Sequence, residues 1–282
     1  MDWQKSKTTL IVSLIITNLI LFVLVLLNFS ESLDQSLSPK FIENTKKILE
    51  DYDIEISCAI PKRHPKLPSL LVEFESYDED SLKRRFFNNA GTITHPSTDR
   101  VEINWNDEHI NLFNYRRIFY EYSGSKEKYE LEDKKDAEKI VNDFLVSHKY
   151  RIDDMNLNYC TEEEGKFYLN YTKIYERKIL ESSYTNFVVD KRGVLSMDRL
   201  WLNVLEKSKR KITLSSATRA LLGLVDKEEA YGKKIISIKD CFYFNPEDQG
   251  YIEDITKALQ GRAIASWRIE FEDGDNIVMD EY

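Results

Sequence analysis

The chain has 282 residues, of which 42% are hydrophobic and 32% are charged, and its formal net charge is −9 at pH 7. That apolar fraction is typical of globular proteins and argues against a disordered chain. The acidic balance, without a basic stripe along the sequence, argues against a nucleic acid partner, because phosphate binding needs clustered Lys and Arg.

The N-terminal segment contains a run of 22 residues without a charge, from Thr8 to Phe29. As a helix, this run would be about 33 Å long, close to the hydrocarbon thickness of a bilayer. No small-residue cleavage site of the signal-peptide kind follows it. A buried core helix is disfavoured because Ile, Leu and Val fill every face. The run predicts an uncleaved transmembrane helix over residues 8–29.

The charges that flank this run predict its direction. Lys5 and Lys7 precede it, whereas Glu31 and Asp34 follow it. The positive-inside rule places the short N-terminus, residues 1–7, in the cytoplasm. The expected location is therefore the cell membrane, with a single span and an extracellular C-terminal part.

One face of the predicted span carries small polar residues. Ser13, Thr17, Leu21 and Leu24 fall near this face and Asn18 flanks it. A partner helix could pack there, since an interhelical hydrogen bond contributes about 1 kcal/mol or less. The alternative, in which each polar side chain bonds the backbone of its own helix, stays open.

The segment up to residue 153 mixes helical and strand patterns. Apolar residues recur at helical spacing after Pro39 and most clearly over residues 133–150. Three prolines between residues 61 and 68 indicate a loop. In chain order the patterns predict a helix from Pro39 to about Tyr52, strands at 54–56 and 70–77, a helix at 81–87, strands at 101–105 and 112–122, and a helix at 133–150.

From Met155 onward the pattern changes to long, aromatic-rich alternating runs. Turn residues separate these runs, and Gly165 and Gly193 supply the positive φ that tight hairpins need. We expect antiparallel strands at 157–160, 166–175, 179–189 and 194–205, a helix from Ser215 or Ser216 to Val225, a strand at 235–244, and a final hairpin of 267–271 with 277–279.

These elements predict an α+β fold. The change of pattern divides the exported part into two small modules, residues 30–153 and 154–282, each combining antiparallel sheet with helices.

No motif in the sequence points to catalysis, a cofactor or a metal. The four histidines are isolated, and the three cysteines, Cys58, Cys160 and Cys241, lack metal-ligand spacing. Three cysteines allow at most one internal disulfide, and its pairing cannot be read from the sequence. Nucleophile elbows and glycine-rich phosphate loops are also lacking. We therefore expect no catalytic, cofactor-binding or metal residues.

Both ends of the chain carry a resemblance to a known family. The opening MDWQKSKTTLIVSLIITNLILF and the segment Ala265-Ser266-Trp267-Arg268-Ile269 resemble the beginning and the Trp-centred ending of the YycI (WalI) family. The length, the acidic exported part and the α+β alternation also agree with that family.

The resemblance implies a non-catalytic accessory regulator of a two-component system that governs cell-wall metabolism. Its expected partners are a sensor histidine kinase of the WalK (YycG) type and a single-pass protein of the YycH type. In that family the anchor helix contacts the kinase's membrane helices, which would give the face of Ser13, Thr17 and Asn18 a role. The alternative hypothesis is a cell-envelope enzyme or a secreted-peptidase inhibitor with a membrane tether.

Overall fold

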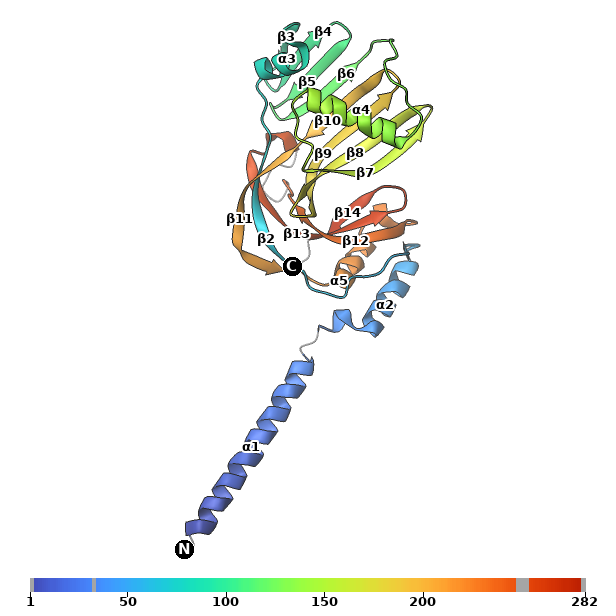
Figure 1. The fold of residues 1–282 in the computed structure, drawn as a ribbon. Helices are drawn as coiled ribbons and strands as arrows, with labels where there is room; N and C mark the ends of the chain where they lie inside the picture. Colours follow the sequence, from blue (N-terminus) through green and yellow to red (C-terminus); the bar gives the residue numbers. More distant parts are fainter. Residues whose placement is uncertain (1–2, 32–33, 247–253, 280–282) are drawn as a thin grey trace.

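A computed structural model of the chain describes residues 3–31, 34–246 and 254–279, with the side chains of residues 3–6, 9 and 24–31 left undescribed. The fold is α+β and dominated by sheet, as predicted (Figure 1). Its α-helices are α1 (Trp3–Glu31), α2 (Pro39–Glu50), α3 (Glu79–Phe87), α4 (Lys134–Ser147) and α5 (Ala217–Leu222). Short 3-10 turns are η1 (Gln35–Leu37), η2 (Gly223–Asp226), η3 (Glu228–Ala230) and η5 (Ile255–Lys257).

The two strongest helical patterns form helices as predicted, and their first turns show why. In α2, Pro39 occupies the first turn and the Ser38 hydroxyl accepts a hydrogen bond from the Phe41 N–H. In α4, the Asp133 carboxylate accepts from two backbone N–H groups, and the helix buries the apolar side chains that share one face. These buried residues are Ala137, Ile140, Val141 and Leu145.

The helix predicted at the N-terminus also forms, and Figure 1 shows α1 standing apart from the sheet. Among the residues that the structure describes, no helix combines the length and the apolar character needed to cross a membrane. The membrane span expected over residues 8–29 thus stays a prediction.

The strands join into one branched sheet, whose main path runs β11-β2-β13-β12-β9-β10-β6-β5-β4-β3. Off this path, β1 pairs with β12, β14 with β13, and β7 with β8, which itself pairs with β9. The strands are β1 (Glu55–Ile56), β2 (Lys66–Phe74), β3 (Thr92–Ser97), β4 (Arg100–Trp105), β5 (Glu108–Phe113), β6 (Arg117–Tyr122), β7 (Met155–Glu163), β8 (Lys166–Tyr175), β9 (Lys178–Asp190), β10 (Gly193–Leu200), β11 (Leu202–Thr213), β12 (Lys234–Tyr243), β13 (Gln260–Phe271) and β14 (Asn276–Met279).

Most pairings are antiparallel, as expected, but two are parallel. Strand β12 runs parallel to β1 and to the start of β9. Neither β1 nor β9 is joined to β12 by a tight turn, because other strands and helices lie between them along the chain, and such long connections permit a parallel neighbour.

Two hydrophobic cores underlie the sheet. The first, here the α5 core, includes Leu70, Leu221 and Trp267. The second, here the α4 core, includes Val141 and Phe187. The chain passes between them at the end of β2, within β9 and at the boundary of β10 and β11. Each core draws on residues from both sides of position 153, and the modules 30–153 and 154–282 stay a prediction.

Two runs that the sequence predicts as single strands are broken in the structure, so these predictions were wrong. The run 112–122 contains a turn between β5 and β6, where Asn114 and Tyr115 have φ angles of 47° and 57°. The run 194–205 is interrupted at Trp201, where the chain leaves its pairing with β9 and begins to pair with β2. Both breaks lack the Asn-Gly or Asp-Gly signature of a tight turn.

Other boundaries differ by a few residues. Strand β2 begins at Lys66, inside the predicted loop of residues 61–68, and β13 begins at Gln260, well before the predicted 267. Strand β3 was not predicted, because its sequence TITHPS is mostly polar and includes a proline. All three cysteines are free.

Candidate functional site

The predicted partner face lies on α1. The side chains of Ser13, Thr17, Asn18 and Leu21 are exposed, whereas the side chain of Leu24 lies outside the described residues. The Thr17 hydroxyl and the Asn18 amide each donate to the backbone carbonyl four residues earlier, at 2.9 and 3.0 Å. Asn18 keeps a second N–H and its carbonyl oxygen for another partner. Contact with a partner helix therefore stays a prediction.

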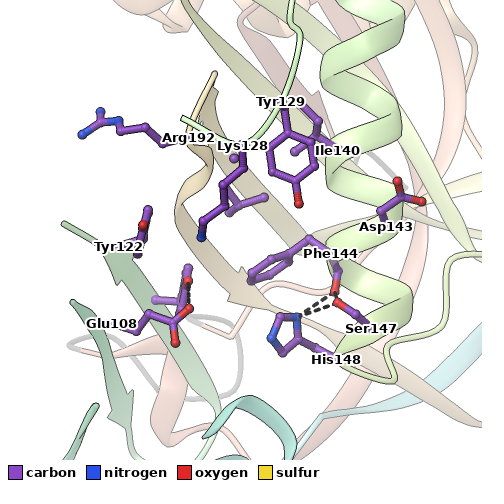
Figure 2. A pocket seen from close by; sticks show the side chains of 13 residues that line it. Glu108, Tyr122, Lys128, Tyr129, Ile140, Asp143, Phe144, Ser147, His148 and Arg192 are labelled. Carbon is purple, nitrogen blue, oxygen red and sulfur yellow. Dashed lines mark hydrogen bonds between the residues drawn. The ribbon is translucent and has the colours of Figure 1, made fainter. Parts of the chain in front are cut away.

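A cavity of about 350 Å³, the α4 cavity, lies between α4 and the sheet (Figure 2). Its walls come from α4, strands β5 and β6, the segment at residues 128–129 and the turn at residues 192–194. Tyr129 and Phe144 present aromatic rings to it, and the charged side chains around it are of both signs.

The charged groups of the α4 cavity are largely compensated by its own wall. The Tyr120 hydroxyl donates to Glu108 Oε1 at 2.9 Å. The Lys128 ammonium lies 4.4 Å from the centroid of the Tyr122 ring, and the Arg192 guanidinium pairs with a carboxylate in its own turn. These contacts fix the wall and leave few free polar groups for a ligand.

His148 completes this wall. Its Nδ1 donates to the Phe144 carbonyl at 2.7 Å and its ring stacks on Phe86 with centroids 4.3 Å apart. Burial lowers the pKa of His148, although the hydrogen bond to the carbonyl opposes that effect. The stacked imidazole is thus a packing element between α3 and α4.

The other histidines have their own neighbours. His64 pairs with Asp34, His95 with Glu79, and His109 approaches the Asn104 amide oxygen. In the described ranges, no group of three or more His, Cys, Asp or Glu side chains could hold a metal ion.

A second cavity, of about 400 Å³, lies where the two cores meet and is referred to as the junction cavity. Its walls come from the end of β2, the segment 149–154 that follows α4, one residue of β8, and the boundary of β10 and β11. Two of these places, the end of β2 and the boundary of β10 and β11, are where the chain passes from one core to the other. The junction cavity is lined mainly by charged and aromatic side chains.

Arg199 is the central charge of the junction cavity and is only 1% exposed. Its guanidinium donates to Glu75 Oε2 at 3.0 Å, to the Tyr77 hydroxyl at 3.2 Å and to Thr185 Oγ1 at 3.0 Å. The rings of Tyr150 and Trp201 lie 4.8 and 4.4 Å from its central carbon.

Two opposing effects set the protonation of this group. Burial would lower the pKa of Arg199, but the Glu75 carboxylate and the surrounding tyrosines raise it above its ordinary value. The charge is therefore permanent, and hydrogen bonds and cation–π contacts hold it in place.

Lys173 on β8 supplies a second buried cation of the junction cavity and is 6% exposed. Its ammonium pairs with the Asp154 carboxylate and lies 5.4 Å from the Trp201 ring centroid. Burying two cations costs several kcal/mol unless each is paired, so the two carboxylates maintain the wall.

Sequence analysis missed the junction cavity. Its residues are scattered from position 73 to position 203 and form no motif. One signal was available: Met197, Arg199 and Trp201 alternate along one strand run, so their side chains share a face. An arginine in phase with two large apolar residues indicates a buried charge.

Comparisons with known proteins give one family and several similar structures. The model of the family described as YycI protein matches residues 34–282. No functionally curated protein matches the chain significantly.

Three solved structures at 10% sequence identity are similar. An uncharacterized protein from Eubacterium rectale has a TM-score of 0.47, covering 76% of this chain and 82% of its own. The C-terminal domain of Bacillus megaterium YpeB has a TM-score of 0.41, covering 73% and 93%. YycH from Bacillus subtilis has a TM-score of 0.48, with 75% of this chain covered and about half, 52%, of the YycH chain.

Proposed function

This chain belongs to the YycI family, and on that premise we propose that it is a non-catalytic accessory regulator of a sensor histidine kinase of the WalK (YycG) type. The observation that carries the proposal is the family match over residues 34–282, which takes in every element after α1. It agrees with the resemblance in the opening and closing motifs. We propose a YycH-type protein as the second partner.

The physical basis of such regulation is a shift in population. A bound protein changes kinase output only if it binds one kinase conformation better than the other. A difference of about 1 to 3 kcal/mol between the two affinities changes the ratio of states by roughly 5- to 150-fold. No covalent chemistry is required of the regulator.

We further propose that α1 anchors the protein in the cell membrane, with residues 1–7 in the cytoplasm and the sheet outside. The support is the charge-free run of 22 residues from Thr8 to Phe29, with Lys5 and Lys7 before it. Fractionation of cells tests the anchor: the full chain should stay with membranes after a carbonate wash, and recovery in the soluble fraction would contradict it.

Co-purification tests the regulatory role. The tagged full-length chain is extracted in a mild detergent and its partners are identified by mass spectrometry, beside a version with an unrelated membrane helix in place of residues 8–29. A sensor histidine kinase and a single-pass protein should co-purify with the native chain and be lost with the exchanged helix. If neither is recovered with the native chain, the proposed function is wrong.

A matched pair of variants tests the α1 face. Thr17→Leu with Asn18→Leu removes the polar groups of the predicted face, whereas Ile15→Leu with Leu19→Ile changes the opposite face and keeps its apolar character. The first pair should reduce kinase recovery several-fold, since a polar contact between membrane helices contributes about 1 kcal/mol. Equal recovery with both pairs would reject this face as the contact.

A further inference from the structure

The junction cavity contains buried polar atoms without partners. Tyr150 is 8% exposed, and among the described residues its buried hydroxyl has no well-aligned hydrogen bond, although the Arg85 guanidinium is a neighbouring donor. The Oδ1 atom of Asp154 is likewise buried and unpartnered, although its Oδ2 pairs with Lys173. Leaving such a group unsatisfied costs about 1 to 3 kcal/mol, so a ligand that reached these two atoms would relieve that cost.

The charge of the cavity indicates the sign of that occupant. Its lining includes five basic and three acidic side chains, in a chain whose net charge is −9. Two of the acids are committed to ion pairs, Glu75 with Arg199 and Asp154 with Lys173.

The charges that remain are mostly positive. Arg151 pairs with Asp153 outside the lining, so the uncompensated groups are Arg85, Lys149 and the single acid Glu73. Neither Arg85 nor Lys149 forms an ion pair within the described part of the chain.

The Arg199 guanidinium is already held in position without a ligand. Arg199 uses three of the five N–H donors of a guanidinium, and the rings of Tyr150 and Trp201 hold it from two sides. Arg85 lies 4.9 Å from the centroid of the Tyr150 ring, which places a second guanidinium against the same aromatic group. Fixed donors of this kind lose little conformational entropy when a ligand binds.

We propose that the junction cavity is a binding site for a small anion that carries a carboxylate or a phosphate group. Arg85 and Lys149 supply the uncompensated charge, the Tyr150 hydroxyl donates to an anionic oxygen, and the spare N–H groups of Arg199 extend the donor set. A volume of about 400 Å³ suits a small molecule. The site does not depend on the kinase partner.

Titration calorimetry of the full chain in a mild detergent tests the site. Sodium phosphate and sodium succinate are the two probes, each against sodium chloride of equal ionic strength. Saturable heat with phosphate alone identifies a phosphate site, and heat with both probes identifies a site selected by charge. If neither probe gives saturable heat, the proposal is overturned, because the cavity would then hold only water.

A neighbouring arginine provides the matched control. Arg85→Gln with Lys149→Gln removes the uncompensated cations, whereas Arg84→Gln alters an exposed arginine on α3 that does not line the cavity. The double variant should bind at least tenfold more weakly and the control should bind as the native chain does. Lys149→Gln alone, at an exposed position, should weaken binding in a chain whose fold is unchanged. Equal binding by all variants overturns the proposal.

Discussion

Arg199 at the junction cavity and Arg268 on β13 are both almost fully buried, at 1% and 2% exposure, yet their surroundings differ. Arg268 pairs with two carboxylates, Glu181 and Glu270. Glu181 lies on β9 and Arg268 on β13, so their 2.5 Å contact joins the two strands that flank β12. Arg199 has one carboxylate partner and lines a cavity.

This difference distinguishes Arg268, whose charge stabilises the fold, from the charges of the junction cavity, which can bind a ligand. Two carboxylates, Glu181 and Glu270, lie within ion-pair distance of Arg268 inside the sheet. At the junction, Arg85 and Lys149 have no ion-pair partner among the described residues and lie beside an open volume. The free energy of unfolding should therefore respond most strongly to changes around Arg268, and ligand binding to changes around Arg199.

Removing the enclosed cation should have the largest effect. Arg268→Met leaves Glu181 without its partner, while Glu270 keeps Lys239 at 3.6 Å, and we expect the free energy of unfolding to fall by about 3 to 5 kcal/mol. Urea unfolding of the full chain in detergent measures the change. The double variant Arg268→Met with Glu181→Leu should recover part of the loss, and a loss below 1 kcal/mol in the single variant would contradict the structural role.

Removing the junction cation should cost less. In Arg199→Met, Glu75 keeps the hydrogen bond from the Tyr77 hydroxyl at 2.5 Å, and its side chain is 25% exposed. We expect a loss of about 2 kcal/mol in the free energy of unfolding, from the hydrogen bonds and ring contacts removed. The same urea measurement applies, with Arg84→Met as the exposed control. A loss equal to that of Arg268→Met would remove the distinction between the two regions.

The pH dependence of stability should distinguish the regions further. Burial raises the pKa of Glu181 above its ordinary 4.5, and Arg268 opposes this rise. A raised carboxyl pKa means that the folded state holds the proton more tightly, so stability falls as pH rises through the folded pKa. In Arg268→Met the pKa should rise further, adding about 1.4 kcal/mol of loss per pKa unit.

Unfolding curves recorded from about pH 4 to pH 8 check this expectation. The stability difference between Arg268→Met and the native chain should widen with pH, whereas the difference for Arg199→Met should change little. Parallel profiles for the native chain and Arg268→Met would show that Glu181 does not titrate as described.

A partly exposed carboxylate should show the smallest effect. Asp34 lies 3.1 Å from His64 and 3.2 Å from Arg219, and it accepts from the Ser36 N–H. Burial opposes ionisation, but the Ser36 hydrogen bonds and the neighbouring Arg219 and His64 side chains dominate and lower the pKa of Asp34. Asp34→Asn should lose about 0.5 kcal/mol at neutral pH.

The sign of this last effect is testable. A lowered carboxyl pKa stabilises the fold above the unfolded value of 3.8, and the contribution is lost as pH falls through the folded pKa. The Asp34→Asn difference should thus vanish in acid, opposite to the trend for Glu181. A difference that persists in acid would assign the effect to the cap geometry rather than to charge.

Much of the fold was predictable because it depends on local patterns. The apolar residues that share one face of α4 lie within a few residues of one another, and Ser38 lies directly before the helix α2 that it caps. The turn at Gly193, with φ at 113°, was likewise visible in the sequence. The missed breaks, at Asn114 and at Trp201, occur where strands change partners and no turn signature marks the change.

The junction cavity was beyond prediction for a related reason. Glu75, Tyr150 and Arg199 are each unremarkable in their own segments, and only the crossing of β2, β9 and β10 between two cores brings them together. Contacts over such sequence distances have no local pattern, because they depend on which strands pair.

By itself, the sequence determined the acidic balance, the charge-free N-terminal run, the main amphipathic helices and the family, because these are written in composition, period and short motifs. The tertiary structure alone decided the strand order, the two cores and the cavity between them. It did so because a strand's alternation specifies which face is buried but not which neighbour it will pair with.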